Sequence, residues 1–328
     1  MTPASVVLGI LAASGYIASH RGARPVAHSA SGDERWGLAS PPAGAAPEAV
    51  WKVEQAAGYE IYSNGLRIDR QYLVNGWPRR YRALERNVDP PVAGPERTDP
   101  AGIVYHTTES HQAPFEEGYR SELRRAGISL LEYVRRRRAY HFVIDRFGRV
   151  FSVVGENDAA GHAGHSIWAD DRWIYLGLNA SFLGVAFEAR GPEVTAAQVH
   201  SARLLTDMLR SRYGIQAGNC VPHAQVSVNP VNCRMSYHSD WAAGFPFAQL
   251  GLPDNYRRTP PSLELFGFGW DAPLARVSGG RPWEGLLVGE QRLLQRAARA
   301  GMSPKRYRAM LQKHYREVVA ALEAAAPR

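Results

Sequence analysis

The sequence predicts an α/β fold, because short runs typical of buried strands alternate with segments of helical periodicity. Residues 102–106, 140–144 and 182–188 are apolar runs of the length of a buried strand. The segments 121–138 and 195–213 instead carry apolar residues at helical spacing. Alternation of this kind indicates helices packed on a β-sheet.

The second helical segment has clear signals at both ends. Thr195 and Gln198 have the spacing of a capping box, in which each side chain bonds the backbone N–H of the other residue. Gly214 follows the last apolar position, and glycine commonly ends helices because it adopts the left-handed conformation at little cost. We therefore expect a helix that begins after Thr195 and ends before Gly214.

Two hairpins are predicted from their turns. Residues 59–62 and 66–68 flank the dipeptide Asn64-Gly65, which supplies the positive φ angles that a tight turn requires. Asp145-Arg146-Phe147-Gly148 separates the strand run 140–144 from a second run at 149–154. Both patterns favour antiparallel pairs of neighbouring strands.

The composition is that of an ordinary globular protein with a substantial core: 328 residues, of which 45% are hydrophobic. The formal net charge of +8 favours an anionic partner such as nucleic acid, acidic lipid or an anionic wall polymer. Much of this charge lies in helical stretches such as 135–138, which indicates solvated helix faces. Because the sequence has no nucleic-acid-binding signature, no nucleic-acid partner is predicted.

The N-terminal segment, residues 1–47, is predicted to direct export. Its apolar run at residues 4–18 is short for a membrane span and has the length of a signal-peptide core. A linker rich in Ala, Ser, Gly and Pro follows. We expect export to the periplasm or cell envelope, with or without cleavage, and association with membrane or cell wall through the N-terminus.

Three further segments are distinguished by composition. Residues 48–100 are predicted to form an N-terminal β extension that ends in a proline-rich connector, and residues 101–256 to form the main domain. Residues 257–328 are predicted to be a Pro- and Gly-rich connector followed by two helices, the first at about 283–300 and the second from Ser303-Pro304. We expect this helical pair to pack on the main domain.

Two histidines and an aspartate suggest a metal site. His106 ends the strand run at 102–105, and His223 comes just after a helix and a strand. Asp240 and Cys233 follow within a short distance along the chain. A single histidine at a strand end is more often structural, but two imidazoles with one carboxylate or thiolate leave a fourth zinc position open for water, which is the pattern of catalytic zinc sites.

Five motifs follow one another between residues 102 and 255. They are V-Y-H-T-T at 104–108, Y-H-F-V-I-D-R-F-G-R-V at 140–150, G-H-A-G at 161–164, the strand at 179–188 and P-H-A at 222–224. In this order they resemble the zinc-dependent N-acetylmuramoyl-L-alanine amidases related to peptidoglycan recognition proteins and phage amidase lysozymes. The resemblance implies a central mixed β-sheet flanked by helices, with residues 101–256 as the zinc amidase domain.

The resemblance also implies an activity. The family hydrolyses the amide between N-acetylmuramic acid and L-alanine in peptidoglycan with Zn²⁺ as cofactor, in cell-wall remodelling or recycling, so peptidoglycan or muropeptides are the expected partners. Members that bind peptidoglycan without cutting it exist, so a non-catalytic binding protein of the same fold is the alternative. A purely structural zinc is a further alternative, which requires Cys233 as a fourth ligand.

The resemblance makes His106 and His223 metal ligands and leaves the third to be chosen. Cys233 stands ten residues after His223, near the place of the family's third ligand. The segment that follows Asp240, however, resembles the segment after the family's ligand aspartate. We therefore predict Asp240 as the third ligand, preceded by an insertion of seven residues, with Cys233 left to pair with Cys220.

Catalytic roles are carried over from the same family. His238 stands where bacterial members have a lysine that stabilises the oxyanion, although it could also be a ligand or contact one. Tyr140 matches the tyrosine of the phage and recognition-protein branch as proton carrier. Glu188 is the alternative carrier, since it lies two residues beyond Ala186, where the other branch has an acid, and a structural ion pair is the other reading of Glu188.

One more residue completes the expected site. His162 belongs to the G-H-A-G motif at 161–164 and is expected to line the groove that binds the substrate. The resemblance thus predicts a zinc ion held by three side chains that activates water and polarises the scissile carbonyl, with catalytic and substrate-binding residues around it.

Overall fold

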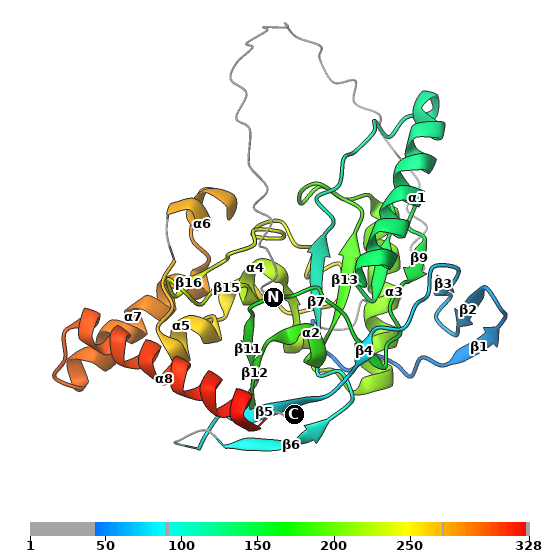
Figure 1. Cartoon of the computed structure of the whole chain (residues 1–328). Coiled ribbons are helices and arrows are strands. Elements are labelled where there is room, and N and C mark those ends of the chain that lie inside the picture. The colour runs from blue at the N-terminus through cyan, green and yellow to red at the C-terminus, as the bar shows by residue number, and fades with distance from the viewer. Residues whose placement is uncertain (1–42, 89–91, 271, 326–328) are drawn as a thin grey trace, which may run out of the picture. The chain divides into compact units, whose positions relative to one another are not determined.

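An eight-stranded mixed sheet, in the order β1-β2-β3-β9-β8-β13-β7-β14, forms the centre of the fold (Figure 1). The computed structural model describes residues 43–88, 92–270 and 272–325. Every residue of the strands at the heart of the sheet is buried, as expected for parallel strands that are covered on both faces. These parallel strands are β8 (Phe142–Ile144), β13 (Phe182–Phe187), β7 (Gly102–Thr107) and β14 (Cys220–Pro222).

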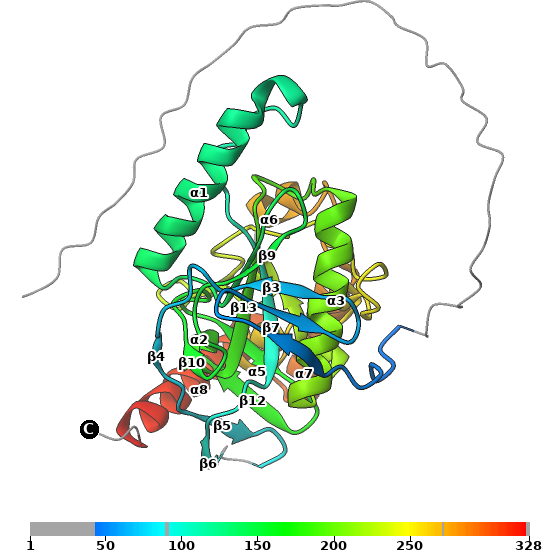
Figure 2. The ribbon, with the colours of Figure 1, turned by 90° about the vertical axis from the view of Figure 1, so that its right-hand side faces the viewer.

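Helices cover both faces of this sheet, with α3 (Ala196–Tyr213) on one face and α1 (Arg120–Arg137) on the other (Figure 2). Successive side chains of a strand point to opposite faces. In β8, Phe142 and Ile144 accordingly lie in the hydrophobic cluster that contains the buried side of α3, and Val143 lies in the cluster that contains the buried side of α1. The predicted fold class, a mixed sheet flanked by helices, is confirmed.

Both predicted ends of α3 are confirmed. Thr195 Oγ1 accepts a hydrogen bond from the Gln198 backbone N–H at 3.1 Å, and Gln198 Oε1 accepts one from the Thr195 N–H at 3.0 Å. Gly214 ends the helix with a φ of 63°. The Thr195 hydroxyl also donates to the carbonyl of Arg146 at 3.0 Å, so the cap fixes the start of α3 to the turn that follows β8.

The N-terminal strands extend the central sheet. Strand β1 (Lys52–Gln55) pairs with β2 (Tyr59–Tyr62), and β2 forms the predicted hairpin with β3 (Arg67–Asp69), with Gly65 at a φ of 82°. Strand β3 then pairs in parallel with β9 (Val150–Ser152), which is antiparallel to β8 as predicted. The N-terminal region is therefore hydrogen-bonded to the central sheet.

A second, four-stranded sheet was not predicted. Its order is β11-β12-β5-β6. Strand β6 (Ala93–Arg97) lies in the proline-rich segment that was predicted to be a connector, so that part of the prediction is wrong. The strand tolerates Pro95 because it lies at the edge of the sheet, where one side needs no hydrogen bonds. The other strands are β5 (Tyr81–Glu85), β11 (Ile167–Ala169) and β12 (Trp173–Leu176).

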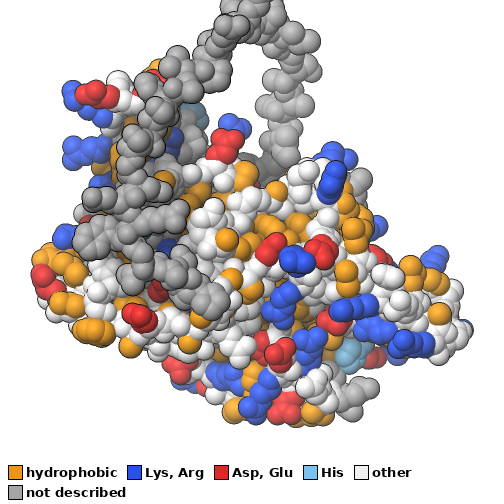
Figure 3. All heavy atoms as spheres, turned by 180° about the vertical axis from the view of Figure 1, so that it is seen from behind, with side chains coloured by type: hydrophobic (Ala, Val, Ile, Leu, Met, Phe, Trp, Pro, Cys, Tyr) orange, Lys and Arg blue, Asp and Glu red, His pale blue; other side chains and the backbone are white. Residues whose placement is uncertain are grey.

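The C-terminal helices pack against this second sheet. Leu263, Phe266, Leu286 and Tyr315 lie in one buried cluster with Ile174 of β12. Lys and Arg side chains are spread over the outer surface of this helical region (Figure 3). The predicted pair of long helices is present, preceded by two short ones: α5 (Pro261–Phe266), α6 (Ala272–Val277), α7 (Glu284–Arg299) and α8 (Pro304–Ala325).

Short elements connect these parts. They are β4 (Trp77–Pro78), β10 (Asp158–Ala159), β15 (Val228–Asn229), β16 (Arg234–Met235), α2 (Leu178–Ser181), α4 (His223–Val226), η1 (Glu117–Tyr119), η2 (Ala217–Asn219) and η3 (Asn255–Arg257). The predicted signal-peptide core at 4–18 lies outside the described residues. Within the described part of the chain, no helix combines the length and the apolar character needed to cross a membrane.

Candidate active site

Strand register brings the two predicted ligand histidines together. Tyr105 of β7 pairs with Pro222 of the parallel strand β14. The next residue of each chain segment, His106 and His223, therefore comes to the same carboxyl edge of the sheet, and their ring centroids lie 4.4 Å apart. Both side chains are buried.

Asp240 reaches these histidines from a loop that is fixed on both sides. Its carbonyl accepts a hydrogen bond from the Ala224 N–H at 3.1 Å, and the next residue, Trp241, is buried in an aromatic cluster. The Asp240 carboxylate then spans the two rings. Oδ1 lies 2.8 Å from His223 Nδ1, and Oδ2 lies 3.1 Å from His106 Nδ1.

The donor set of these three side chains fits a zinc ion. One ligand atom from each of His106, His223 and Asp240 lies within 4.8 Å of the others, and all three residues are buried. Burial by itself raises the pKa of Asp240, but the nearby His223 and His106 outweigh it and hold that pKa well below the usual range. The result is a buried carboxylate beside two imidazoles, and a divalent cation would balance its charge.

The two cysteines have no part in this site. Cys220 and Cys233 are both free and buried, so the expected disulfide between them is wrong. They lie in different hydrophobic clusters, Cys220 below α3 and Cys233 among the C-terminal helices. Among the described residues, the metal-capable group contains three side chains and no sulfur, so the alternative of a structural zinc with Cys233 as its fourth ligand has no support.

His162 lies behind His106 rather than on an open surface. Its side chain is buried, and both ring nitrogens are in hydrogen bonds. Nδ1 lies 3.1 Å from Nε2 of His106, and Nε2 lies 3.2 Å from the carbonyl oxygen of Phe182. The expectation that His162 lines the substrate groove does not agree with this position.

Tyr140 and His238 flank the metal-capable group. The Tyr140 ring lies 5.0 Å from the ring of His106, and the His238 ring stacks on His223 at 4.9 Å with an interplanar angle of 19°. Burial raises the pKa of Tyr140, so its hydroxyl keeps its proton at neutral pH. Partial burial and then the charge of His223 lower the pKa of His238, which favours its neutral form.

The two glutamates near the carboxyl edge of the sheet differ in their surroundings. Glu188 accepts a hydrogen bond from the Arg146 N–H, in the β8–β9 turn, at 3.3 Å. Burial, the largest cause, raises the pKa of Glu188, although this hydrogen bond and nearby arginines act in the opposite direction. Glu109 was not predicted. The pKa of Glu109 is raised first by burial and then by the charge of Asp240, which places its carboxylate within electrostatic reach of the site.

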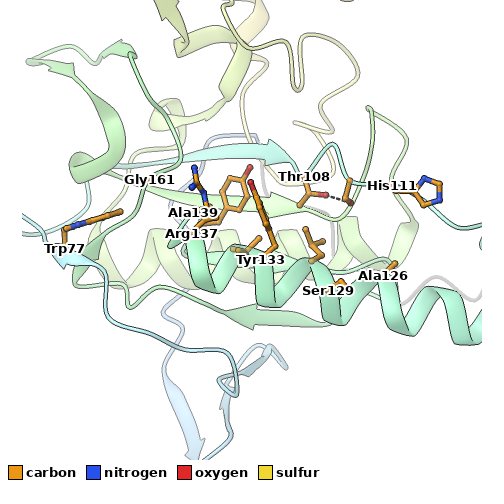
Figure 4. Close-up of a pocket in the computed structure, with 13 residues that line it drawn as sticks. Trp77, Thr108, His111, Ala126, Ser129, Tyr133, Arg137, Ala139 and Gly161 are labelled. Atoms are coloured by element: carbon orange, nitrogen blue, oxygen red, sulfur yellow. Dashed lines mark hydrogen bonds between the residues drawn. The ribbon is translucent and has the colours of Figure 1, made fainter. Parts of the chain in front are cut away.

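A pocket of about 760 Å³ opens beside Tyr140. Figure 4 shows Ser129 and Tyr133 of α1 along one side, with Trp77 and His111 towards opposite ends. Its lining includes no acidic side chain. This size and mixed lining suit a small organic ligand or a segment of a larger one.

The sequence also matches the model of a known protein family. Residues 96–240 match the sequence model of the N-acetylmuramoyl-L-alanine amidase family. The predicted resemblance is thereby confirmed, and the matched segment includes both histidines of the metal-capable group and ends at Asp240. No curated protein matches the chain significantly.

The chain is also similar to solved structures at low sequence identity. The amidase LysC from Clostridium intestinale URNW is 22% identical, over 54% of this chain and 93% of that chain, with a TM-score of 0.30. The amidase AmiD from E. coli is 22% identical, over 48% of this chain and 61% of that chain, with a TM-score of 0.36. The Drosophila peptidoglycan recognition protein SD is 17% identical, over 40% and 73% respectively, with a TM-score of 0.29.

Two buried histidines, His106 and His141, make stability depend on pH. Burial, the largest cause, lowers the pKa of His106 to about 4 and that of His141 to about 3. Histidine in the unfolded chain titrates near ~6.5, so the unfolded state binds protons first on acidification. Stability is therefore full above a pH of about 6.5 and falls as the pH decreases towards 4, by about 1.4 kcal/mol per pH unit for each such histidine.

Urea unfolding of the metal-free protein, followed by tryptophan fluorescence at pH values of about 7.5, 6 and 5, measures this dependence. Chelator in all samples keeps metal release from contributing to the slope. A free energy of unfolding that stays constant across this range would contradict the expectation.

Proposed function

We propose that this protein is a zinc-dependent amidase that hydrolyses the amide between N-acetylmuramic acid and L-alanine in peptidoglycan or muropeptides. The observation that carries the proposal is the convergence of His106, His223 and Asp240 at the carboxyl edge of the sheet, inside a segment that matches the amidase family. Export to the periplasm or cell envelope, expected from residues 4–18, agrees with this substrate and is part of the proposal.

His106, His223 and Asp240 would hold the zinc ion, which when bound lowers the pKa of a water molecule and polarises a carbonyl. Tyr140 keeps its proton and can donate a hydrogen bond to the carbonyl oxygen on which charge develops. His238, on the other side of the group, can donate a second one from its neutral ring. The pocket beside Tyr140 leaves room for the part of the substrate next to the scissile bond.

Release of dye-labelled fragments from peptidoglycan, with and without chelator, tests the proposal. We expect hydrolysis that chelator stops and added zinc restores, and mass spectrometry should find new amino termini on L-alanine. Binding to peptidoglycan without any release, in a zinc-loaded protein, would instead establish the non-catalytic binding protein.

Tyr140→Phe is expected to slow hydrolysis by about 10²-fold, because it removes a positioned donor and proton carrier. Glu188→Gln is expected to have little effect on the rate, because that carboxylate is bonded to the backbone of Arg146. Single-turnover rates, measured on zinc-loaded variants of equal metal content, separate the two. If Glu188→Gln slowed hydrolysis and Tyr140→Phe did not, the carboxylate would be the proton carrier.

A further inference from the structure

The hydrogen bonds of His162 determine where its proton lies. Nε2 of His162 is 3.2 Å from the backbone carbonyl oxygen of Phe182. Because a carbonyl oxygen can only accept, this nitrogen carries the hydrogen. A neutral imidazole has one donor and one acceptor nitrogen, so Nδ1 of His162 is an acceptor.

The proton of His106 is placed by its contact with His162. Its Nε2 lies 3.1 Å from the acceptor Nδ1 of His162, so Nε2 of His106 is the donor and carries the hydrogen. Nδ1 of a neutral His106 is left with a free lone pair. This atom lies 3.1 Å from Asp240 Oδ2, which can also only accept, so in this tautomer two lone pairs face each other, and a cation held between them would remove their repulsion.

We propose that His162 is a positioning residue: it keeps the proton of His106 on Nε2 and thereby presents the Nδ1 lone pair of His106 to the metal. The inference rests on the proposed zinc site. Outer partners of this kind fix the tautomer and orientation of a ligand histidine, and their loss typically weakens metal binding by about 10–100-fold. Here the partner is an uncharged imidazole that is itself set by a backbone carbonyl.

His162 can hold this position because the residue of β13 that faces its ring is a glycine. A Cβ atom on Gly184 of β13 would lie 2.6 Å from Cγ of His162, so glycine allows the ring to lie directly against the strand. The backbone N–H of His162 also donates to Oδ1 of Asn179 at 2.9 Å. The ring is therefore fixed from one side by β13 and through its own backbone by Asn179.

A second buried histidine supports Gly184 in turn. Nδ1 of His141 accepts a hydrogen bond from the Gly184 N–H at 2.8 Å, so Nε2 of His141 is a donor, and it lies 3.0 Å from the carbonyl oxygen of Asp158. Arg79 of the N-terminal region donates to the same carbonyl at 2.6 Å and is only 3% exposed. Buried contacts thus run from the N-terminal region to the back of His106.

Zinc affinity, measured by competition with a chromogenic chelator, tests the proposal without depending on hydrolysis. His162→Leu removes the acceptor but retains volume, and zinc binding is expected to weaken about 10–100-fold. His162→Gln is the matched control, because its amide can accept from His106 and donate to Phe182 as the imidazole does, so near-native affinity is expected. Equal affinity of the wild type and both variants would overturn the proposal.

If His162→Leu does not fold, a measurement on the wild type alone still tests the role of His162. In zinc-loaded protein labelled with ¹⁵N-histidine, His106 is expected to carry its hydrogen on Nε2, and a hydrogen on Nδ1 would overturn the proposal. A wild type that binds zinc with this tautomer but does not cut peptidoglycan would refute the proposed function and support the role of His162. A wild type that cuts peptidoglycan while His162→Leu binds zinc normally would refute only the role of His162.

Discussion

Asp240→Ala is expected to weaken zinc binding by about two to three decades and to abolish hydrolysis of peptidoglycan, whereas Cys233→Ser is expected to preserve both. Asp240 places one carboxylate oxygen within about 3 Å of each histidine, at 2.8 and 3.1 Å, and supplies the only negative charge of the group. A structural zinc site of four ligands contributes about 10–16 kcal/mol, so removing one ligand is expected to cost roughly 3–4 kcal/mol, or two to three decades in affinity.

Zinc content after gel filtration, measured by atomic emission, gives the result directly, and circular dichroism checks that each variant is folded. Cys233→Ser is a suitable control because it changes the other side chain proposed as third ligand and lies in the cluster of the C-terminal helices. Loss of zinc from Cys233→Ser with retention by Asp240→Ala would overturn the ligand assignment.

Gly285→Ala is expected to destabilise the protein by about 3 kcal/mol, the upper part of the range for inserting a methyl group into a packed contact. A Cβ atom at this position in α7 would lie 1.8 Å from the carbonyl oxygen of Arg258 and 2.3 Å from its carbonyl carbon. Both are backbone atoms, so no side-chain rotation can relieve the overlap, and α7 must move away from η3.

The matched control is Gly127→Ala, which also places alanine in a helix. The nearest atom to the added methyl group is Glu188 Oε2 at 4.0 Å, so no overlap arises and the higher helix propensity of alanine should stabilise by up to ~1 kcal/mol. Urea unfolding midpoints of the two variants measure the contrast. Equal midpoints would show that α7 does not depend on this close approach.

Gly285→Ala is also expected to affect the site. Trp283 precedes α7, and its indole N–H donates to the carbonyl of Ala242 at 2.7 Å. The Tyr256 ring stacks on Trp283, and the Tyr256 hydroxyl donates to the carbonyl of Trp241 at 2.6 Å. The C-terminal region thus holds the loop that carries Asp240, so movement of α7 should weaken zinc binding as well as stability.

Elements with local chemical signals could be predicted from the sequence. The capping box at Thr195, the stop at Gly214 and the turn at Asn64-Gly65 all depend on residues a few positions apart, and the structure contains each of them. Strand β6 has no such signal. Its conformation depends on pairing with β5, and a proline within it argues against a strand unless the strand is known to lie at an edge.

In the candidate site, too, some residues could be predicted from sequence motifs and others depend on distant contacts. The order of motifs indicated His106, His223 and Asp240, which the structure brings together. The assignment of Glu188 relied on the alternation of side chains along β13, but that strand ends at Phe187, and beyond its end the rule no longer determines direction. Spacing also could not reveal that Cys233 is packed in a different cluster from the metal-capable group.

Because β3 pairs in parallel with β9, the family match and the central sheet begin at different places in the chain. The family match begins at residue 96, but the sheet that holds the site includes three strands from before that point, and Arg79 fills a buried position behind it. The segment that matches the family is therefore shorter than the part of the chain that forms the central sheet. An exchange of residues 96–240 between proteins would therefore have to include the preceding strands, or the new host would have to replace their hydrogen bonds.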